Sequence, residues 1–447
     1  MLSRPKLVYE RIKQSAYPEN LVLLGILLFP VLSLSVRHWL SGIYSLLALL
    51  ALFVVFRKSH DLFKEEKILF ALFILLLLSF TISASLNGWS DNSIRRLSNV
   101  LKYILFFPTY LLIRQYKDLS GLLFMGIVTG GAALGLQAIF DVFYLGLPQG
   151  SGIYGTIIFG DLSILFFSTT LILLFFKKEF SVTTWLYIIS AMLSALAVYL
   201  SGSRNAWIAS VFCVLVIPLL CFKFMKYKRA ILVIVPIVTI SASTFFFTET
   251  VHKRLNLAVS EFTTFVAQGA PKDIPIKYNS VGFRLEQWRV ALHITHDAFF
   301  FGYGGGNAGK HVKRYAEKGL AHPDLIVLDT ERGIGGLHST YFETLINEGV
   351  IGLAVMFVFV FYPIYTFLKA RESSPLLSTV GIIFVTNYMI FGISENPFVH
   401  DNFTSVYLIL LSVFFSETIR NKYLDKGHRM AAYGQDGFSC ENTYSTK

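Results

Sequence analysis

Three short segments hold the residues whose types and spacing are best suited to chemistry. The first reads SGSRNAWIA and places Arg204 where an apolar helix is predicted to begin at the membrane surface. A guanidinium in that position is a strong ligand for an anion such as phosphate. It could equally extend to lipid headgroups, as basic residues at the ends of membrane helices commonly do.

The second segment, GFRLEQW, is predicted to be helical, so that Arg284 and Trp288 share one face and Arg289 follows them. A guanidinium beside an indole can bind a phosphate or a sugar. The alternative is an ordinary amphipathic helix that lies at the membrane interface. Spacing alone does not decide between these two interpretations.

The third segment, GGLHSTYFETLINEGVIGL, places His338 immediately before a long apolar run. The glycines ahead of it allow the backbone to come close to a ligand. Imidazole is the usual general base near neutral pH, whereas a lone histidine at a membrane interface is often structural. His338 is therefore a candidate base whose role needs further support.

Further candidates lie in or beside the predicted membrane spans. Asp161 is expected roughly 13 Å along its span at 1.5 Å per residue. An intramembrane carboxylate is a functional candidate, but Asp161 could also form a hydrogen bond that packs two helices together. The outer end of another span carries three basic residues, Arg95, Arg96 and Lys102. They could line an entrance for anionic lipid or contact lipid headgroups.

No metal site is predicted. His293 and His296, with Asp297 beside them, have the spacing of metal ligands, but no third and fourth ligands are evident. The three cysteines show neither disulfide nor zinc spacing.

Composition identifies the elements that must position these residues. The chain of 447 residues is 54% hydrophobic and only 15% charged, which is typical of an all-α polytopic membrane protein. The formal net charge of +11 is spread in short clusters between apolar runs, so it indicates membrane topology and not nucleic-acid binding. The lipid bilayer is the main expected partner.

About twelve runs are long enough to span hydrocarbon. Lys and Arg concentrate in alternate connections between them, which places both termini in the cytoplasm. We expect membrane helices over 1–248 and 341–420, a large periplasmic loop over 249–340 and a cytoplasmic tail over 421–447. The runs lie near 20–36, 39–56, 67–86, 96–113, 120–146, 152–176, 181–200, 205–222, 230–248, 341–368, 375–394 and 403–419.

The large loop between the ninth and tenth runs is expected to be partly helical and functional. Apolar residues recur at helical spacing in 282–300 and 307–320, and GYGGGN between them is typical of a turn.

Taken together, SGSRNAWIA, the later RxxxW and HSTYFETLxxEGxxG resemble the O-antigen ligase and polymerase superfamily. Its members carry S-R-x-x-W at a periplasmic helix end and H-[NS]-x-[YF] at the close of a long periplasmic loop. The number of spans, the loop and the order of motifs are similar over most of the chain. Asn205 departs from the pattern, since glycine is frequent there. The single large loop and the IIFGDL segment look more like the ligase branch.

The resemblance implies transfer of a polysaccharide from undecaprenyl diphosphate to a sugar hydroxyl of lipid A-core in the bacterial inner membrane, without metal or other cofactor. It implies that His338 is the base and that Arg204 and Arg284 bind the departing diphosphate. Direct displacement would invert the anomeric configuration. The secondary candidates are Arg289, Arg95, Arg96, Asp161 and Trp288.

Three other functions remain open at this point. An O-antigen polymerase would use a second lipid-linked repeat unit as acceptor. A transporter of lipid-linked sugar would carry its ionisable residues deep within the spans, whereas most candidates here lie at the outer face. A membrane scaffold could use the same loop to bind partner proteins.

Overall fold

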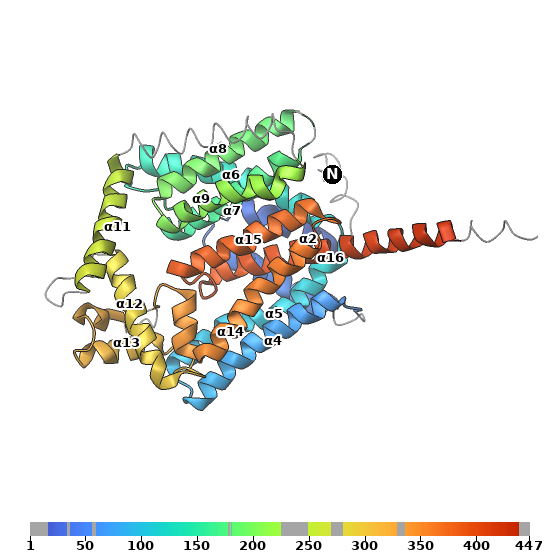
Figure 1. Cartoon of the computed structure of the whole chain (residues 1–447). Helices are drawn as coiled ribbons and strands as arrows, with labels where there is room; N and C mark the ends of the chain where they lie inside the picture. The colour runs from blue at the N-terminus through green and yellow to red at the C-terminus, as the bar shows by residue number, and fades with distance from the viewer. Residues whose placement is uncertain are drawn as a thin grey trace, which may run out of the picture.

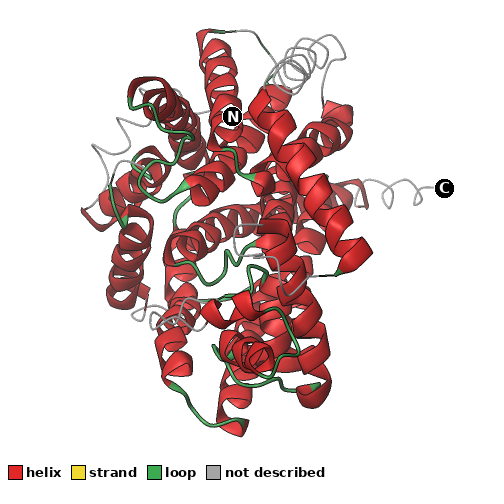
Figure 2. Ribbon diagram, turned by 90° about the vertical axis from the view of Figure 1, so that its left-hand side faces the viewer, coloured by secondary structure: helices red, strands yellow, loops and turns green. Residues whose placement is uncertain are grey.

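The computed structural model describes residues 17–33, 36–55, 60–177, 179, 181–224, 249–269, 280–328 and 336–437. Within these ranges the chain forms helices joined by turns and loops, without a strand (Figure 2). The predicted all-α polytopic fold is confirmed. The expected run at 230–248 and the end of the tail lie outside the described residues.

Eight helices in the described part are long and apolar enough to cross a membrane. They are α4 (Lys64–Leu86), α6 (Leu119–Ile139, continued by the π-helical η2, Phe140–Tyr144), α7 (Thr156–Phe176), α8 (Val182–Ser201), α9 (Arg204–Cys221), α14 (Thr340–Lys369), α15 (Pro375–Ser394) and α16 (Asp401–Gly437). Two shorter apolar helices, α2 (Tyr17–Val31) and α3 (Trp39–Val54), and the more polar α5 (Asp91–Gln115) accompany them. Every predicted run except 230–248 therefore coincides with a described helix.

One boundary changes the position of a candidate residue. α7 begins at Thr156 and not near 152, because Gly155 precedes it in a left-handed conformation with φ of 91°. Asp161 consequently lies roughly 8 Å along α7 at 1.5 Å per residue, nearer to the end of the helix than expected.

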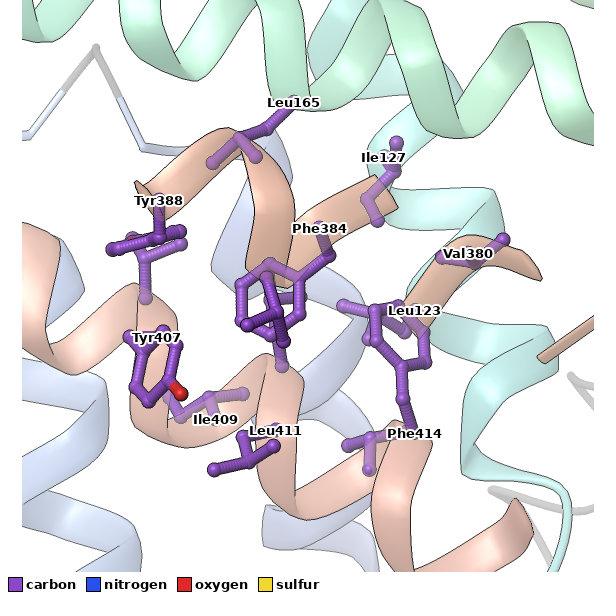
Figure 3. Packing of buried hydrophobic residues seen from close by; sticks show 14 of the residues in the cluster. Leu123, Ile127, Leu165, Val380, Phe384, Tyr388, Tyr407, Ile409, Leu411 and Phe414 are labelled. Carbon is purple, nitrogen blue, oxygen red and sulfur yellow. The ribbon is translucent and has the colours of Figure 1, made fainter. Parts of the chain in front are cut away.

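The membrane helices share one core in which aromatic rings are prominent. Phe384 of α15 packs against Tyr407 and Phe414 of α16, with ring centroids 5.3 Å and 6.1 Å away. Figure 3 shows these rings among aliphatic side chains from α6 and α7. α6 also approaches α8 closely, since a Cβ at Gly135 would lie 2.5 Å from the carbonyl oxygen of Leu193. Small residues allow such close packing between membrane helices.

The described part of the predicted loop forms helices. It contains α11 (Glu249–Gln268), α12 (Ser280–Thr295), the 3-10 turn η4 (His296–Ala298), α13 (Ala308–Glu317) and η5 (Pro323–Leu328). The helices expected at 282–300 and 307–320 are confirmed with slightly shifted ends. A separate small apolar core joins them, which includes Val290, Val312 and Leu325. Figure 1 shows α11, α12 and α13 together on the side opposite to that on which α16 projects.

α14 is interrupted where the loop meets it. Gly349 has φ of 71°, so the helix breaks between its short first part and its long second part. The segment 299–306 docks into this break, and the N–H of Tyr303 donates to the carbonyl of Ile346 at 2.8 Å. A Cβ at Gly349 would lie 2.3 Å from the carbonyl oxygen of Phe300, so only glycine fits. The break fixes the loop against the membrane helices.

Basic residues from several connections meet beside the distal part of α16. Lys422 donates to Glu65 at 2.5 Å, and Arg420 donates to the carbonyl oxygen of Tyr116 at 3.1 Å. Arg371 donates to the carbonyl oxygen of Leu220. Connections that are rich in Lys and Arg in the sequence therefore gather at one end of the bundle, which we call the basic end. The loop helices lie at the other end, the loop end.

Candidate active site

Glu395 is the centre of a charged cluster at the loop end. It follows α15 directly, and its side chain is 10% exposed. The guanidinium of Arg284, from α12, donates to Glu395 Oε1 at 2.8 Å. Nδ1 of His338, from the segment before α14, lies 3.5 Å from the same oxygen. Three segments that are distant in sequence thus converge on one carboxylate.

The backbone around His338 is held firmly in place. His338 has φ of 46°, a left-handed conformation that is uncommon for a residue other than glycine and is frequent at functional sites. The hydroxyl of Ser339 donates to the carbonyl of Gly392 at 3.2 Å, and the N–H of Thr340 donates to the carbonyl of Glu395 at 3.1 Å. These bonds fix the start of α14 to the end of α15. The His338 side chain is 45% exposed, so a substrate can reach it.

Electrostatics favour an ionised Glu395. Burial raises the pKa of this carboxyl, but the hydrogen bond from His338 and the positive charge of Arg284 outweigh burial and hold the pKa below its usual value. Burial in turn lowers the pKa of His400, which precedes α16. The ionised carboxylate can accept a hydrogen bond from the Nδ1–H of His338. The other ring nitrogen, Nε2, then points away from Glu395.

Arg204 lies beside this cluster. It opens α9, and its Nη1 is 3.9 Å from Oε2 of Glu261 in α11. The next residue, Asn205, accepts a hydrogen bond from Ser394, which directly precedes Glu395. The start of α9 and the end of α15 are therefore in contact, and Arg204 belongs to the same end of the bundle as Arg284.

Asp161 approaches the cluster from inside the helical bundle. A Cβ on the preceding Gly160 would lie 2.6 Å from Oγ of Ser201 and 2.7 Å from Cβ of Ser203, so α7 packs tightly against the turn before α9. Asp161 is buried and interacts electrostatically with Glu395. Its Oδ1 has no hydrogen-bond partner among the described residues. The IIFGDL and SGSRNAWIA segments thus meet in space.

Trp288 and Arg289 are engaged in packing within the loop. The indole of Trp288 stacks on Phe342 of α14 with centroids 5.2 Å apart, so it docks α12 on α14. Arg289 makes two hydrogen bonds of 2.7 Å to Glu286, with one to each carboxylate oxygen. The structure therefore gives these two secondary candidates structural partners.

The three basic residues of α5 differ in exposure and in their partners. Arg95 is exposed, whereas Arg96 turns inward and forms an ion pair with the buried Glu343 of α14. Lys102 lies 3.0 Å from Oδ1 of Asp401 at the start of α16. Two of the three thus pair with carboxylates of other helices.

The cluster combines the groups needed to move a proton and to stabilise an anion. An imidazole oriented by a carboxylate can accept a proton from a hydroxyl. Guanidiniums at the same site can stabilise negative charge on a departing group. Across the described ranges, no three His, Cys, Asp or Glu side chains are grouped as metal ligands would be.

Sequence reasoning missed Glu395 and Glu343. The available signal for Glu395 was a single acidic residue at the end of an uncharged span, in a connection over 394–402 that lacks Lys and Arg. For Glu343 the signal was a carboxylate one turn into an apolar helix. An intramembrane or interfacial carboxylate of this kind is a functional candidate by default.

Two comparisons with known proteins bear on this site. The model of a family described as O-antigen ligase matches residues 189–357, from within α8 to within α14. An uncharacterized protein of Haemophilus influenzae is 24% identical over 372 residues, which cover 81% of this chain and 89% of that protein. The resemblance to O-antigen ligases is confirmed over the matched range, which contains Arg204, Arg284 and His338.

The family match supports a function related to that of the O-antigen ligase and polymerase superfamily, whose members are glycosyltransferase-like enzymes. It also implies a lipid-linked glycan as substrate and a membrane environment. Glu395, Asp161 and Arg96 lie outside the matched range, so their assignment depends on the geometry of this structure alone.

Proposed function

We propose that this protein is an O-antigen ligase, which transfers a polysaccharide from undecaprenyl diphosphate to a sugar hydroxyl of lipid A-core. The observation that carries the proposal is the convergence of His338 and Arg284 on Glu395 at the loop end. The O-antigen ligase family match over 189–357 supports the same reading. Polymerase activity would use the same chemistry with a lipid-linked repeat unit as acceptor.

In the proposed reaction His338 acts as the base. The acceptor hydroxyl oxygen forms a bond to the anomeric carbon of the donor while its proton passes to Nε2 of His338. The bond between that carbon and the diphosphate oxygen breaks, and its electron pair stays on the diphosphate. Because the attack is direct, the new glycosidic bond has the opposite anomeric configuration.

Arg284 and Arg204 stabilise the charge that develops on the diphosphate. The guanidinium of Arg284 donates a hydrogen bond to Glu395, and because a guanidinium has five N–H donors, others can bind phosphate oxygens. Arg204 lies at the neighbouring start of α9. Asp161 and Glu395 act through these groups, since each is buried behind them.

The proposed setting is the bacterial inner membrane. The gathering of basic residues at one end of the bundle supports placing that end, with both termini, in the cytoplasm. The loop over 249–340 with the charged cluster would then face the periplasm, where the lipid-linked donor and lipid A-core meet.

A reconstituted assay tests this function. Purified protein is mixed with lipid-linked polysaccharide and rough lipopolysaccharide in the presence of a chelator and without nucleotide. His338→Ala is expected to lower the transfer rate by about 10²–10⁴-fold, because a positioned base contributes that much. The exposed His296 provides a matched control, and His296→Ala is expected to retain the activity.

The product identifies the function. Polysaccharide on lipopolysaccharide supports the ligase, whereas longer chains on undecaprenyl diphosphate would make the protein a polymerase. Movement of the donor across the membrane without either product would make it a transporter. Undiminished transfer by His338→Ala would remove this histidine from the mechanism.

A further inference from the structure

A second polar site lies beside the charged cluster. A cavity with about 750 Å³ of empty space, part of it open to solvent, lies among α4, α5, α14 and the segment after α15. Figure 1 shows α4 running along α14. Thr340 and Asn396 line the cavity, and each is a near neighbour in sequence of His338 or Glu395. The cavity therefore ends beside the segments that hold His338 and Glu395, on the side of α5.

Two carboxylates give the cavity its chemical character. Glu343 is 2% exposed; its Oε1 pairs with the Arg96 guanidinium, whereas its Oε2 has no hydrogen-bond partner among the described residues. Glu348 accepts a hydrogen bond of 2.5 Å from Ser79. A buried carboxylate oxygen without a hydrogen-bond donor is costly, so a ligand that donates a hydrogen bond to Oε2 would stabilise it.

The charges select the kind of ligand. Two carboxylates and one guanidinium line the cavity, so a phosphate would face more negative than positive charge there. Sugar hydroxyls can donate to the carboxylates and can also bond the amides of Asn99 and Asn347. The rings of Phe80 and Phe359 line the same cavity and supply apolar surface for the carbon faces of a sugar ring.

The cavity and the helix that carries Arg284 lie on different sides of α14. Phe342 faces α12, where it stacks on Trp288, whereas Glu343 faces Arg96 of α5. Successive residues of a helix point roughly 100° apart, since a turn holds 3.6 residues. His338 contacts Glu395, the partner of Arg284, and lies two residues before Thr340, which lines the cavity.

We propose that the cavity lined by Glu343, Glu348 and Arg96 binds the acceptor sugar, while the diphosphate binds on the Arg284 side. This inference rests on the proposed transfer function. An inverting displacement needs the attacking hydroxyl and the departing group on opposite faces of the donor sugar. The separation of the cavity from Arg284 across α14 provides that arrangement, and Glu343 orients the acceptor hydroxyls.

Binding measurements on the purified full chain test the site without depending on transfer. The probes are a dephosphorylated core oligosaccharide from rough lipopolysaccharide and inorganic pyrophosphate. Glu343→Gln is expected to weaken oligosaccharide binding at least tenfold and to leave pyrophosphate binding unchanged. Arg284→Ala is expected to have the reverse pattern.

A second variant separates binding from stability. Thr344 also lines the cavity, and Thr344→Phe fills it without changing a charge, so it should weaken oligosaccharide binding to a similar extent. Glu372→Gln, on the exposed turn after α14, is the matched carboxylate control and should bind both probes normally. Thermal unfolding of each variant identifies any that is misfolded.

The outcomes distinguish this inference from the proposed function. Normal oligosaccharide binding by folded Thr344→Phe and Glu343→Gln would overturn the inference, even if transfer to lipopolysaccharide is observed. Loss of pyrophosphate binding in Glu343→Gln would overturn it too, because the cavity would then be a phosphate site. Oligosaccharide binding that depends on Glu343, in a protein without transfer activity, would support the sugar site and refute the transfer function.

Discussion

The two ends of the helical bundle each contain a buried glutamate that pairs with an arginine, but the surroundings of the two pairs differ. At the basic end Glu66 is fully buried and accepts hydrogen bonds from Tyr110 at 2.8 Å, Arg114 at 2.7 Å and the N–H of Phe63 at 2.8 Å. All its partners come from the protein. This pair joins α4 to α5.

At the loop end Glu395 has partners that are open to ligands. The side chain of His338 is 45% exposed and that of Arg284 is 20% exposed. Glu343, in the same region, pairs with Arg96 through Oε1, but its Oε2 has no hydrogen-bond partner among the described residues. An ion pair is therefore a poor marker of function by itself. The loop end differs from the basic end because its charged side chains can still form hydrogen bonds and a ligand can reach them.

Replacing the arginine of each pair should give the largest difference between the two ends. Arg284→Ala is expected to lower the transfer rate by about 10²–10³-fold, because it removes a donor that stabilises the developing charge. Arg114→Ala should instead destabilise the protein by about 3 kcal/mol, since it leaves Glu66 buried without its charge partner. Initial rates per folded molecule and thermal unfolding measure the two effects. Equal loss of rate in both variants would show that the ends do not differ in function.

The glycine at the break in α14 tests whether the loop end depends on its docked segment. Gly349→Ala forces alanine into a backbone conformation, with φ of 71° and ψ of −167°, that is essentially restricted to glycine and costs about 1–3 kcal/mol, and it brings Cβ against the carbonyl of Phe300. We expect a lower melting temperature and faster proteolysis near 299–306. Gly42 of α3 has open space around it, so Gly42→Ala is the control. An unchanged melting temperature in Gly349→Ala would mean that the break is not required.

A smaller effect of pH should appear at the loop end. Burial and the charges of Arg314 and Lys310 lower the pKa of His311 from 6.5 to about 4, and its ring stacks on Tyr303. The folded state therefore favours neutral His311, and its contribution to stability is present above pH 6.5 and is lost as pH falls toward 4.

Melting temperatures over this pH range provide the measurement. His311→Phe retains a stacking ring and cannot titrate, so its melting temperature should depend less on pH than that of the wild type. An identical pH profile for the two proteins would show that His311 does not contribute.

The sequence predicted the helices well because each membrane span must be a long apolar run. It also placed His338 and Arg284 at the same end, since motif order and loop length were visible. The residues that join them were not predictable. Glu395 meets them only because α12, α14 and α15 converge, and Gly349 breaks α14 only because a distant segment docks there.

Some predicted roles depended on partners that a sequence does not reveal. Arg284 and Trp288 lie on one helix, as their spacing predicted. The indole of Trp288 stacks on Phe342, so the packing of α12 on α14 explains its position without a bound sugar. Arg96 of α5 pairs with a carboxylate of α14, a helix that is distant in sequence. Such pairs follow from tertiary packing, which local periodicity does not encode.

The most direct test of the account compares Glu395→Gln with Glu66→Gln in one preparation, with transfer rate and melting temperature measured for each. Both changes remove a buried negative charge beside an arginine and keep the side-chain shape. We predict that Glu395→Gln loses most of the transfer rate with little change in melting temperature, and that Glu66→Gln does the opposite. Full transfer by Glu395→Gln would contradict the assignment of the active site to the loop end.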